Sequence, residues 1–162
     1  MGFEWAYKNG VPPWDIGRAQ PAIVRLAEQG LIAGDVIDLG CGTGENALYL
    51  ASCGLAAVGV DAAPTAITRA QEKARLRGSS ATFLVADARA LEGLERTFDV
   101  AIDCGLFHTF SDADRVRFER SLHRTLRAGG HHVLLCFNEH QPGEVGPRRV
   151  TQAEIRATFA TG

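Results

Sequence analysis

Short apolar runs alternate with amphipathic stretches along most of this chain. The apolar runs predict strands over residues 36–39, 56–60, 81–86, 98–103 and 131–137. Apolar positions with helical spacing predict helices over residues 21–29, 45–51, 64–77, 111–127 and 151–159. Strands that alternate with helices form a parallel sheet that helices cover on both faces. The pattern therefore predicts one doubly wound α/β domain.

The stretch from residue 36 to residue 51 organises this fold. Its strand runs into glycines at positions 40, 42 and 44, and a helix follows them. Glycine suits a tight turn where a ligand approaches the backbone, because a Cβ would collide with the ligand. The unpaired N–H groups at the start of the helix also favour an anionic group such as a carboxylate. Strand, glycine turn and helix together are the opening unit of a nucleotide-binding α/β domain.

The spacing of the glycines separates two classes of nucleotide-binding protein. The dinucleotide pattern G-x-G-x-x-G/A, begun at Gly40, would need a glycine or an alanine where Glu45 stands. The chain has D-x-G-x-G-x-G instead, with Asp38 on the strand. This pattern resembles motif I of the class I S-adenosylmethionine-dependent methyltransferases. A nicotinamide-dependent oxidoreductase shares the opening unit and is the less favoured alternative.

The resemblance implies a Rossmann-like sheet of strand order 3-2-1-4-5 and S-adenosylmethionine as the cofactor. Gly40 and Gly42 would lie under its methionyl part. Asp61 ends the second strand about twenty residues after the first glycine, where an acid holds the ribose hydroxyls. Asp87, after the third strand, would accept from the adenine amino group, and the next backbone N–H would donate to the ring. The other cofactor contacts that we expect are Trp14, Asp38, Cys41, Ala62, Ala88 and the carbonyl of Cys104.

The N-terminal segment P-P-W-D-I-G-R-A-Q-P-A-I resembles the lid of small-molecule methyltransferases of the thiopurine and halide/thiol type. In such a lid Trp14 would close over the cofactor; alternatively, it only packs the segment onto the domain. Pro12 and Pro13 stop any helix, so residues 1–13 read as irregular. We expect a lid segment and helix over residues 1–30 and the cofactor-binding domain over residues 31–162.

The methyl acceptor is constrained mainly by features that the sequence lacks. There are 17 basic and 19 acidic residues, and no basic stripe that would favour nucleic acid or an anionic membrane. The loop after the fourth strand begins at Cys104 and has no Pro-Pro-aromatic motif of the kind found in methyltransferases of nucleic-acid bases. We expect a small molecule with a sulfur, oxygen or nitrogen nucleophile. A module that binds the cofactor without turnover is an alternative.

Methyl transfer from a sulfonium needs mainly approach and alignment, and it needs a general base only if the nucleophile arrives protonated. His108 and His140 are candidate bases because both are expected at the rim of the cleft, and Tyr7 is a weaker candidate. Each histidine has an alternative role as a surface or packing residue. No arrangement of potential ligands indicates a metal site.

The four cysteines form no C-x-x-C pair, and we expect them to be small buried hydrophobic residues. Cys41 and Cys104 should lie at the ends of neighbouring strands. The sequence has neither an apolar run of membrane-spanning length nor a signal peptide, so we expect a cytoplasmic protein.

The resembled family ends its sheet with an antiparallel hairpin, for which these residues supply no strands. We therefore expect the apolar run of residues 133–137 to leave a free sheet edge. Such an edge favours self-association of the chain or lowers its stability.

Overall fold

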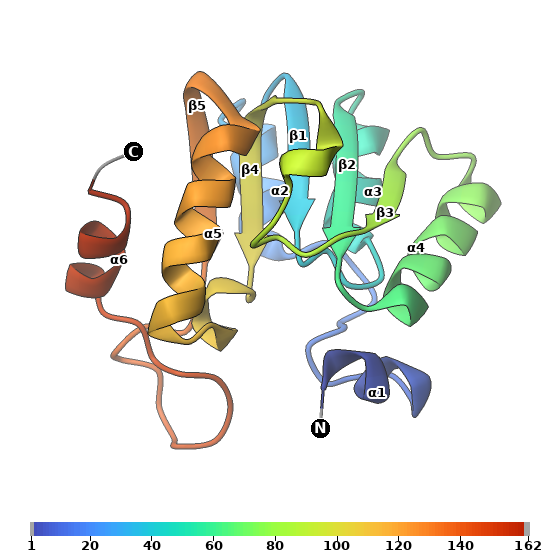
Figure 1. The fold of residues 1–162 in the computed structure, drawn as a ribbon. Helices are drawn as coiled ribbons and strands as arrows, with labels where there is room; N and C mark the ends of the chain where they lie inside the picture. The colour runs from blue at the N-terminus through green and yellow to red at the C-terminus, as the bar shows by residue number, and fades with distance from the viewer. Residues whose placement is uncertain (1, 161–162) are drawn as a thin grey trace.

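A computed structural model describes residues 2–160 and shows a five-stranded parallel sheet between two layers of helices (Figure 1). The strand order is β3-β2-β1-β4-β5, which confirms the predicted doubly wound fold. The strands are β1 (Asp35–Leu39), β2 (Ala56–Asp61), β3 (Thr82–Val85), β4 (Phe98–Cys104) and β5 (Leu126–Leu135). The helices are α1 (Phe3–Lys8), α2 (Pro21–Glu28), α3 (Glu45–Ser52), α4 (Pro64–Arg77), α5 (Asp112–Thr125) and α6 (Gln152–Thr158), with short 3-10 turns η1 (Glu92–Leu94) and η2 (Phe107–Thr109).

The two faces of the sheet bury different apolar clusters, because neighbouring residues of a strand point to opposite faces. Val36 belongs to a cluster with side chains of α2, α3 and α4. Its neighbour Ile37 belongs to a second cluster with Phe118 and Leu122 of α5. Figure 1 shows α5 in front of the sheet and α2 and α3 behind it. Helices therefore cover both faces, as the strand pattern requires.

The carboxyl ends of the parallel strands meet at one edge of the sheet, where α/β proteins bind ligands. Strand β1 lies between β2 and β4, with Leu39 level with Val60 on one side and with Asp103 on the other. The glycine loop, residues 40–44, therefore leaves β1 between the ends of its two neighbours. Helix α1 and the loop of residues 138–150 lie at this same end of the molecule (Figure 1).

The prediction of an irregular N-terminus is wrong, because Phe3–Lys8 form helix α1. A helix this short is marginal alone, and contacts with α4 hold it in place. Tyr7 is buried, and the Glu4 carboxylate accepts from the backbone N–H (3.0 Å) and the hydroxyl (2.7 Å) of Thr65. These partners lie far away along the chain, so the local sequence pattern does not reveal the helix.

The predicted start of the fifth strand at residue 131 is also wrong, and the helix before it ends two residues earlier than predicted. Helix α5 ends at Thr125, and β5 begins at once with Leu126, which pairs with Phe98 of β4. The register then shifts, so that Val100 pairs with His131 and the intervening residues form an irregularity in the strand. A strand that starts before its glycines reads as a turn in the sequence.

Strand β5 is the last strand of the sheet, and its outer edge carries no further strand among residues 2–160. Leu135 at its end is 38% exposed. Self-association through this edge stays a prediction. Among residues 2–160, no helix has the length and apolar character needed to cross a membrane.

Candidate functional site

The glycine loop has a backbone that glycine adopts most easily. Gly40, Gly42 and Gly44 have φ angles of +68°, +54° and +86°. A Cβ on Gly40 would lie 3.0 Å from the Cβ of Leu106, and a Cβ on Gly42 would lie 2.7 Å from the hydroxyl oxygen of Tyr7. The loop after β4 and helix α1 therefore both approach the glycine backbone closely.

Asp61 connects the end of β2 to this loop. Its Oδ2 accepts from the backbone N–H of Gly42 (2.9 Å), and its Oδ1 accepts from the backbone N–H of Ala63 (2.8 Å). Burial raises the pKa of the Asp61 carboxyl. Each carboxylate oxygen keeps one further lone pair, so Asp61 can brace the loop and accept from a diol at the same time. Ala62 beside it is exposed.

Two more carboxyl groups are buried near the ends of β1 and β4. Asp38 is 1% exposed, and among the described residues only the backbone N–H of Ala47 lies close enough to its carboxyl group to lower its pKa. Burial, with smaller contributions from the charges of Asp103 and Asp61, raises its pKa to about 8. Asp103 accepts from the backbone N–H groups of Leu106 (2.8 Å) and Phe107 (3.1 Å), and burial raises its pKa to about 7. Acids from three adjacent strands favour a cationic ligand here.

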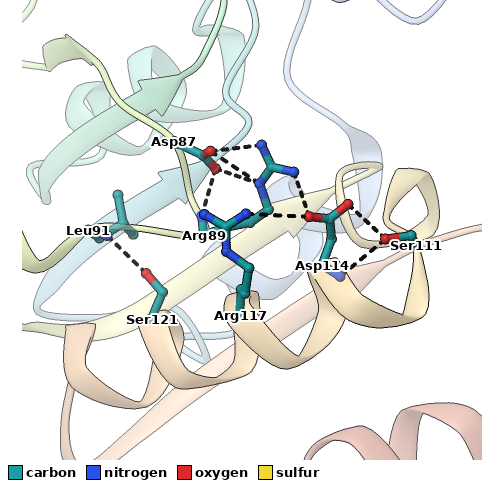
Figure 2. A network of polar contacts seen from close by, with 7 residues as sticks. All are labelled: Asp87, Arg89, Leu91, Ser111, Asp114, Arg117 and Ser121. Atoms are coloured by element: carbon teal, nitrogen blue, oxygen red, sulfur yellow. Dashed lines mark hydrogen bonds and ion pairs between the residues drawn. The ribbon is translucent and has the colours of Figure 1, made fainter.

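Asp87 lies after β3 and is bound by Arg89, a residue of the same loop (Figure 2). The Arg89 side chain donates from Nε to Oδ1 (2.9 Å) and from Nη2 to Oδ2 (2.8 Å) of this carboxylate. These hydrogen bonds hold the pKa of Asp87 below its usual range. Ala88, between the two residues, is buried. The ion pair fixes the direction of the carboxylate that is predicted to meet adenine.

The cysteines near the loop carry free thiols. Burial raises the pKa of Cys41 and of Cys104 far above the ordinary value, so both stay protonated and neither is an activated nucleophile. Cys136 is also partly buried, whereas Cys53 is exposed, against expectation, because it lies at the end of α3. The role of the Cys104 carbonyl stays a prediction.

The two candidate bases have different surroundings. His108 is 7% exposed, and its Nδ1 accepts from the backbone N–H of Phe137 (3.0 Å). The neutral ring then carries its proton on Nε2, and burial lowers the pKa of His108. As a general base, His108 would have to give up the bond to Phe137. His140 is exposed on the loop that follows β5, where its backbone N–H donates to the side chain of Asn138 (3.0 Å).

The N-terminal segment is docked against the glycine loop. Trp14, which is 47% exposed, donates from Nε1 to the buried hydroxyl of Tyr7 (3.0 Å). Asp15 accepts from the hydroxyl of Thr43 in the glycine loop (2.8 Å). Arg69 on α4 donates to the backbone carbonyl of Tyr7. Burial raises the pKa of the Tyr7 phenol to about 12, which makes it a poor base at neutral pH.

Three side chains of this site were not found from the sequence. Arg89 had a signal, because a guanidinium two residues after an acid can reach back to it. Asp103 had the same signal as Asp61, an acid near the carboxyl end of a buried strand. Thr43 had none, since its partner Asp15 is 28 residues away.

A cavity of about 630 Å³ lies apart from these residues, between residues 17–19, α3 and the end of α4. Residues 2–160 contain no group of three or more side chains that could hold a metal ion.

Residues 36–130 match the model of a family described as a methyltransferase domain. This chain belongs to that family. The methyltransferase domain is 43% identical over 148 residues to the 2-heptyl-1-hydroxyquinolin-4(1H)-one methyltransferase of Mycobacteroides abscessus. The match covers 90% of this chain and 65% of the relative, so the chain spans about two thirds of that protein.

Two solved structures share the fold along almost the whole domain. One, from a study of the conversion of a disulfide bond into a thioacetal group during echinomycin biosynthesis, has a TM-score of 0.90 at 40% identity. That match covers 99% of this chain and 77% of the other. The second is the Burkholderia thailandensis 1,6-didemethyltoxoflavin-N1-methyltransferase with bound 1,6-didemethyltoxoflavin and S-adenosylhomocysteine, with a TM-score of 0.77 at 25% identity, covering 98% of this chain and 72% of that one.

These findings confirm the predicted family and S-adenosylmethionine as its cofactor. The residues present fit that cofactor. Asp61 keeps lone pairs that can accept from the ribose hydroxyls, and the acids Asp38, Asp61 and Asp103 suit the positive charge of a sulfonium and an ammonium group.

Proposed function

We propose that this domain transfers the methyl group of S-adenosylmethionine to a small-molecule acceptor. The observation that carries the proposal is the pairing of Gly42 with Asp61. Gly42 has a left-handed backbone with no space for a Cβ, and its N–H donates to the carboxylate that ends the next strand. The glycine loop is thereby tied to a carboxylate that can still accept from a diol.

The proposed contacts assign each part of the cofactor to a different strand end. The methionyl part is assigned to residues 40–42 and the Cys104 carbonyl, the ribose to Asp61 and Ala62, and the adenine to Asp87 and Ala88. Asp38 and Asp103 would supply negative potential near the sulfonium. Trp14 would cover the cofactor as part of a lid over residues 1–30, because its segment already contacts the glycine loop through Asp15.

When bound, S-adenosylmethionine supplies a methyl group on a positively charged sulfur. The nucleophile of the acceptor attacks the methyl carbon in line with the carbon–sulfur bond, and S-adenosylhomocysteine leaves. The work of the chain is to align the acceptor and to hold the glycine loop in place. An acceptor that arrives protonated also needs a base. His108 and His140 stay the candidates, and the bond from Phe137 to His108 favours a packing role for that ring.

The proposed acceptor is a flat, largely apolar molecule with a sulfur, oxygen or nitrogen nucleophile. Two similar proteins are named as methyltransferases of a hydroxyquinolone and of a didemethyltoxoflavin. This chain exposes three aromatic rings on the segment that contacts the glycine loop, Phe3 (50%), Trp5 (52%) and Trp14 (47%), and the ring centroids of Phe3 and Trp14 lie 5.7 Å apart. Exposed aromatic rings offer a flat ligand a stacking surface.

A nucleic-acid acceptor is not favoured, because the net charge of the chain is −2. The cytoplasmic location of the protein stays a prediction.

The test is a turnover assay with methyl-labelled S-adenosylmethionine and a matched set of thiol, phenol and N-hydroxy heterocycles. We expect label transfer to at least one acceptor, and its loss in Asp61→Ala. Glu72→Ala is the control, because Glu72 forms only an exposed ion pair with Arg75 on α4. Binding of S-adenosylhomocysteine without transfer to any acceptor would contradict turnover and indicate a binding module.

A further inference from the structure

Arg89 binds the Asp87 carboxylate, and the glycine motif gives Arg89 no role. We propose that Arg89 is a positioning residue, which orients the Asp87 carboxylate so that one acceptor position on Oδ2 stays available for the amino group of adenine. The inference rests on the proposed function, since it concerns how the same cofactor is selected. Figure 2 shows the Arg89 guanidinium between the carboxylates of Asp87 and Asp114.

The count of hydrogen bonds at Asp87 leads to this role. An ionised carboxylate offers about four lone-pair positions, two on each oxygen. Oδ1 accepts from the backbone N–H of Arg89 (2.9 Å) and from its Nε (2.9 Å), so both of its positions are occupied. Oδ2 accepts from Nη2 (2.8 Å) and shares the Nε proton at a longer distance (3.2 Å). The contact from Nε to Oδ2 is the longest of the four and uses a proton that Oδ1 already accepts, so this position on Oδ2 is the one that a further donor can take.

The other end of the guanidinium is fixed as well. Its Nη1 donates to Oδ1 of Asp114 (2.7 Å), near the start of α5. Asp114 is held in turn by the Ser111 hydroxyl, which donates to its Oδ2 (2.8 Å) and accepts from its backbone N–H (3.2 Å) as the cap of α5. The Arg89 guanidinium carbon also lies 5.7 Å from the centre of the Phe110 ring. Arg89 thus connects the loop after β3 to the first turn of helix α5.

This geometry differs from that of an ordinary surface ion pair. Arg89 uses three separate donor groups on its side chain, and the planar fork fits a carboxylate with both oxygens in register. Without the fork, the Asp87 side chain, which is 36% exposed, could rotate toward solvent. The loss should then appear in the recognition of the adenine amino group, and not in the contacts to ribose or methionine.

The experiment compares two ligands by calorimetric titration: S-adenosylhomocysteine and its purine analogue, which lacks only the 6-amino group. The unmodified chain should prefer the amino compound by about tenfold, as expected for a hydrogen bond to a charged acceptor. Arg89→Met should reduce this preference to less than about threefold, mainly by weakening the amino compound. Arg89→Lys, which keeps the charge without the fork, should restore it only in part.

Arg75→Met is the matched control, because Arg75 also forms a two-pronged ion pair, with Glu72, but on the exposed surface of α4. It should leave the preference unchanged, and thermal melts should show that every variant is folded at the titration temperature. A full tenfold preference in Arg89→Met, or equal weakening of both ligands, would overturn the positioning role. Failure of the unmodified chain to bind S-adenosylhomocysteine would instead overturn the proposed function and this inference with it.

Discussion

The hydroxyl of Tyr7 lies 2.7 Å from the point where a Cβ on Gly42 would stand. A residue of the N-terminal helix thus touches the backbone of the loop that is proposed to cradle the cofactor. Trp14 also donates to this hydroxyl, so helix α1, the segment around Trp14 and the glycine loop meet at one point. Changes at Gly42 should therefore affect the N-terminal segment and the cofactor together.

Gly42→Ala should weaken S-adenosylhomocysteine binding by at least about tenfold, because the methyl group meets Tyr7 and the left-handed backbone costs about 1–2 kcal/mol in alanine. Gly54→Ala is the matched control. Gly54 has a φ of +86° and nothing within 4 Å of its Cβ position, so this variant should lose stability without losing affinity. Titration of both variants, each with a thermal melt, checks the prediction. Equal affinity in the two would show that Tyr7 does not crowd the site.

The N-terminal segment should open more readily than the sheet, and Arg69 should control the opening. Arg69 donates to the carbonyls of Tyr7 and of Gly10. Arg69→Met should raise hydrogen exchange over residues 3–20 while exchange in β1 and β4 stays unchanged. Bound S-adenosylhomocysteine should slow exchange over the same residues. Identical protection of the segment with and without ligand would refute its role as a lid.

The extent to which this structure follows from the sequence depends on how local each contact is. The glycine loop and Asp61 could be predicted because strand, turn and next strand end lie within one βαβ unit. The bonds of Glu4 to Thr65 and of Arg89 to Asp114 join residues 61 and 25 positions apart, so no periodic pattern reports them. Helix α1 was missed for that reason. The start of β5 was missed because the register irregularity after Leu126 places glycines inside a strand.

Cofactor binding should tighten as the pH rises from about 6 to about 8.5, because Asp38 and Asp103 have pKa values of about 8 and about 7. Between about pH 4 and pH 8, the folded chain keeps the protons of the Asp38 and Asp103 carboxyl groups, whereas the unfolded chain has released them. Their contribution to stability is therefore complete below about pH 4 and is lost as the pH rises to about 8. A cation bound nearby favours the ionised forms of Asp38 and Asp103. The protein should therefore release protons from these two carboxyl groups when S-adenosylmethionine binds.

Calorimetry in buffers of different ionisation enthalpy measures this proton release. S-adenosylhomocysteine lacks the sulfonium charge, so the protein should release fewer protons when it binds this ligand. Asp38→Asn should flatten the pH dependence for both ligands. Equal affinity of the unmodified chain for S-adenosylmethionine at about pH 6 and about pH 8.5 would contradict a role for Asp38 and Asp103 in binding.

His108 should act mainly through its bond to Phe137. His108→Asn can keep an acceptor near the Nδ1 position and should retain most of the turnover, whereas His108→Leu leaves a backbone N–H unpaired and should lose about 1–3 kcal/mol of stability. Turnover assays and denaturant melts of the two variants check this pair of outcomes. If His108→Asn is stable but inactive with a protonated acceptor, the ring is the general base and the packing role is wrong.

S-adenosylmethionine is proposed to bind across the glycine loop and Asp61. The most direct measurement is a calorimetric titration of the unmodified chain and of Asp61→Ala with S-adenosylhomocysteine and, separately, with a nicotinamide dinucleotide. We predict one site for S-adenosylhomocysteine, no binding of the dinucleotide, and a loss of about 1–3 kcal/mol of binding free energy in Asp61→Ala. An unchanged dissociation constant in Asp61→Ala, or preferential binding of the dinucleotide, would contradict the account.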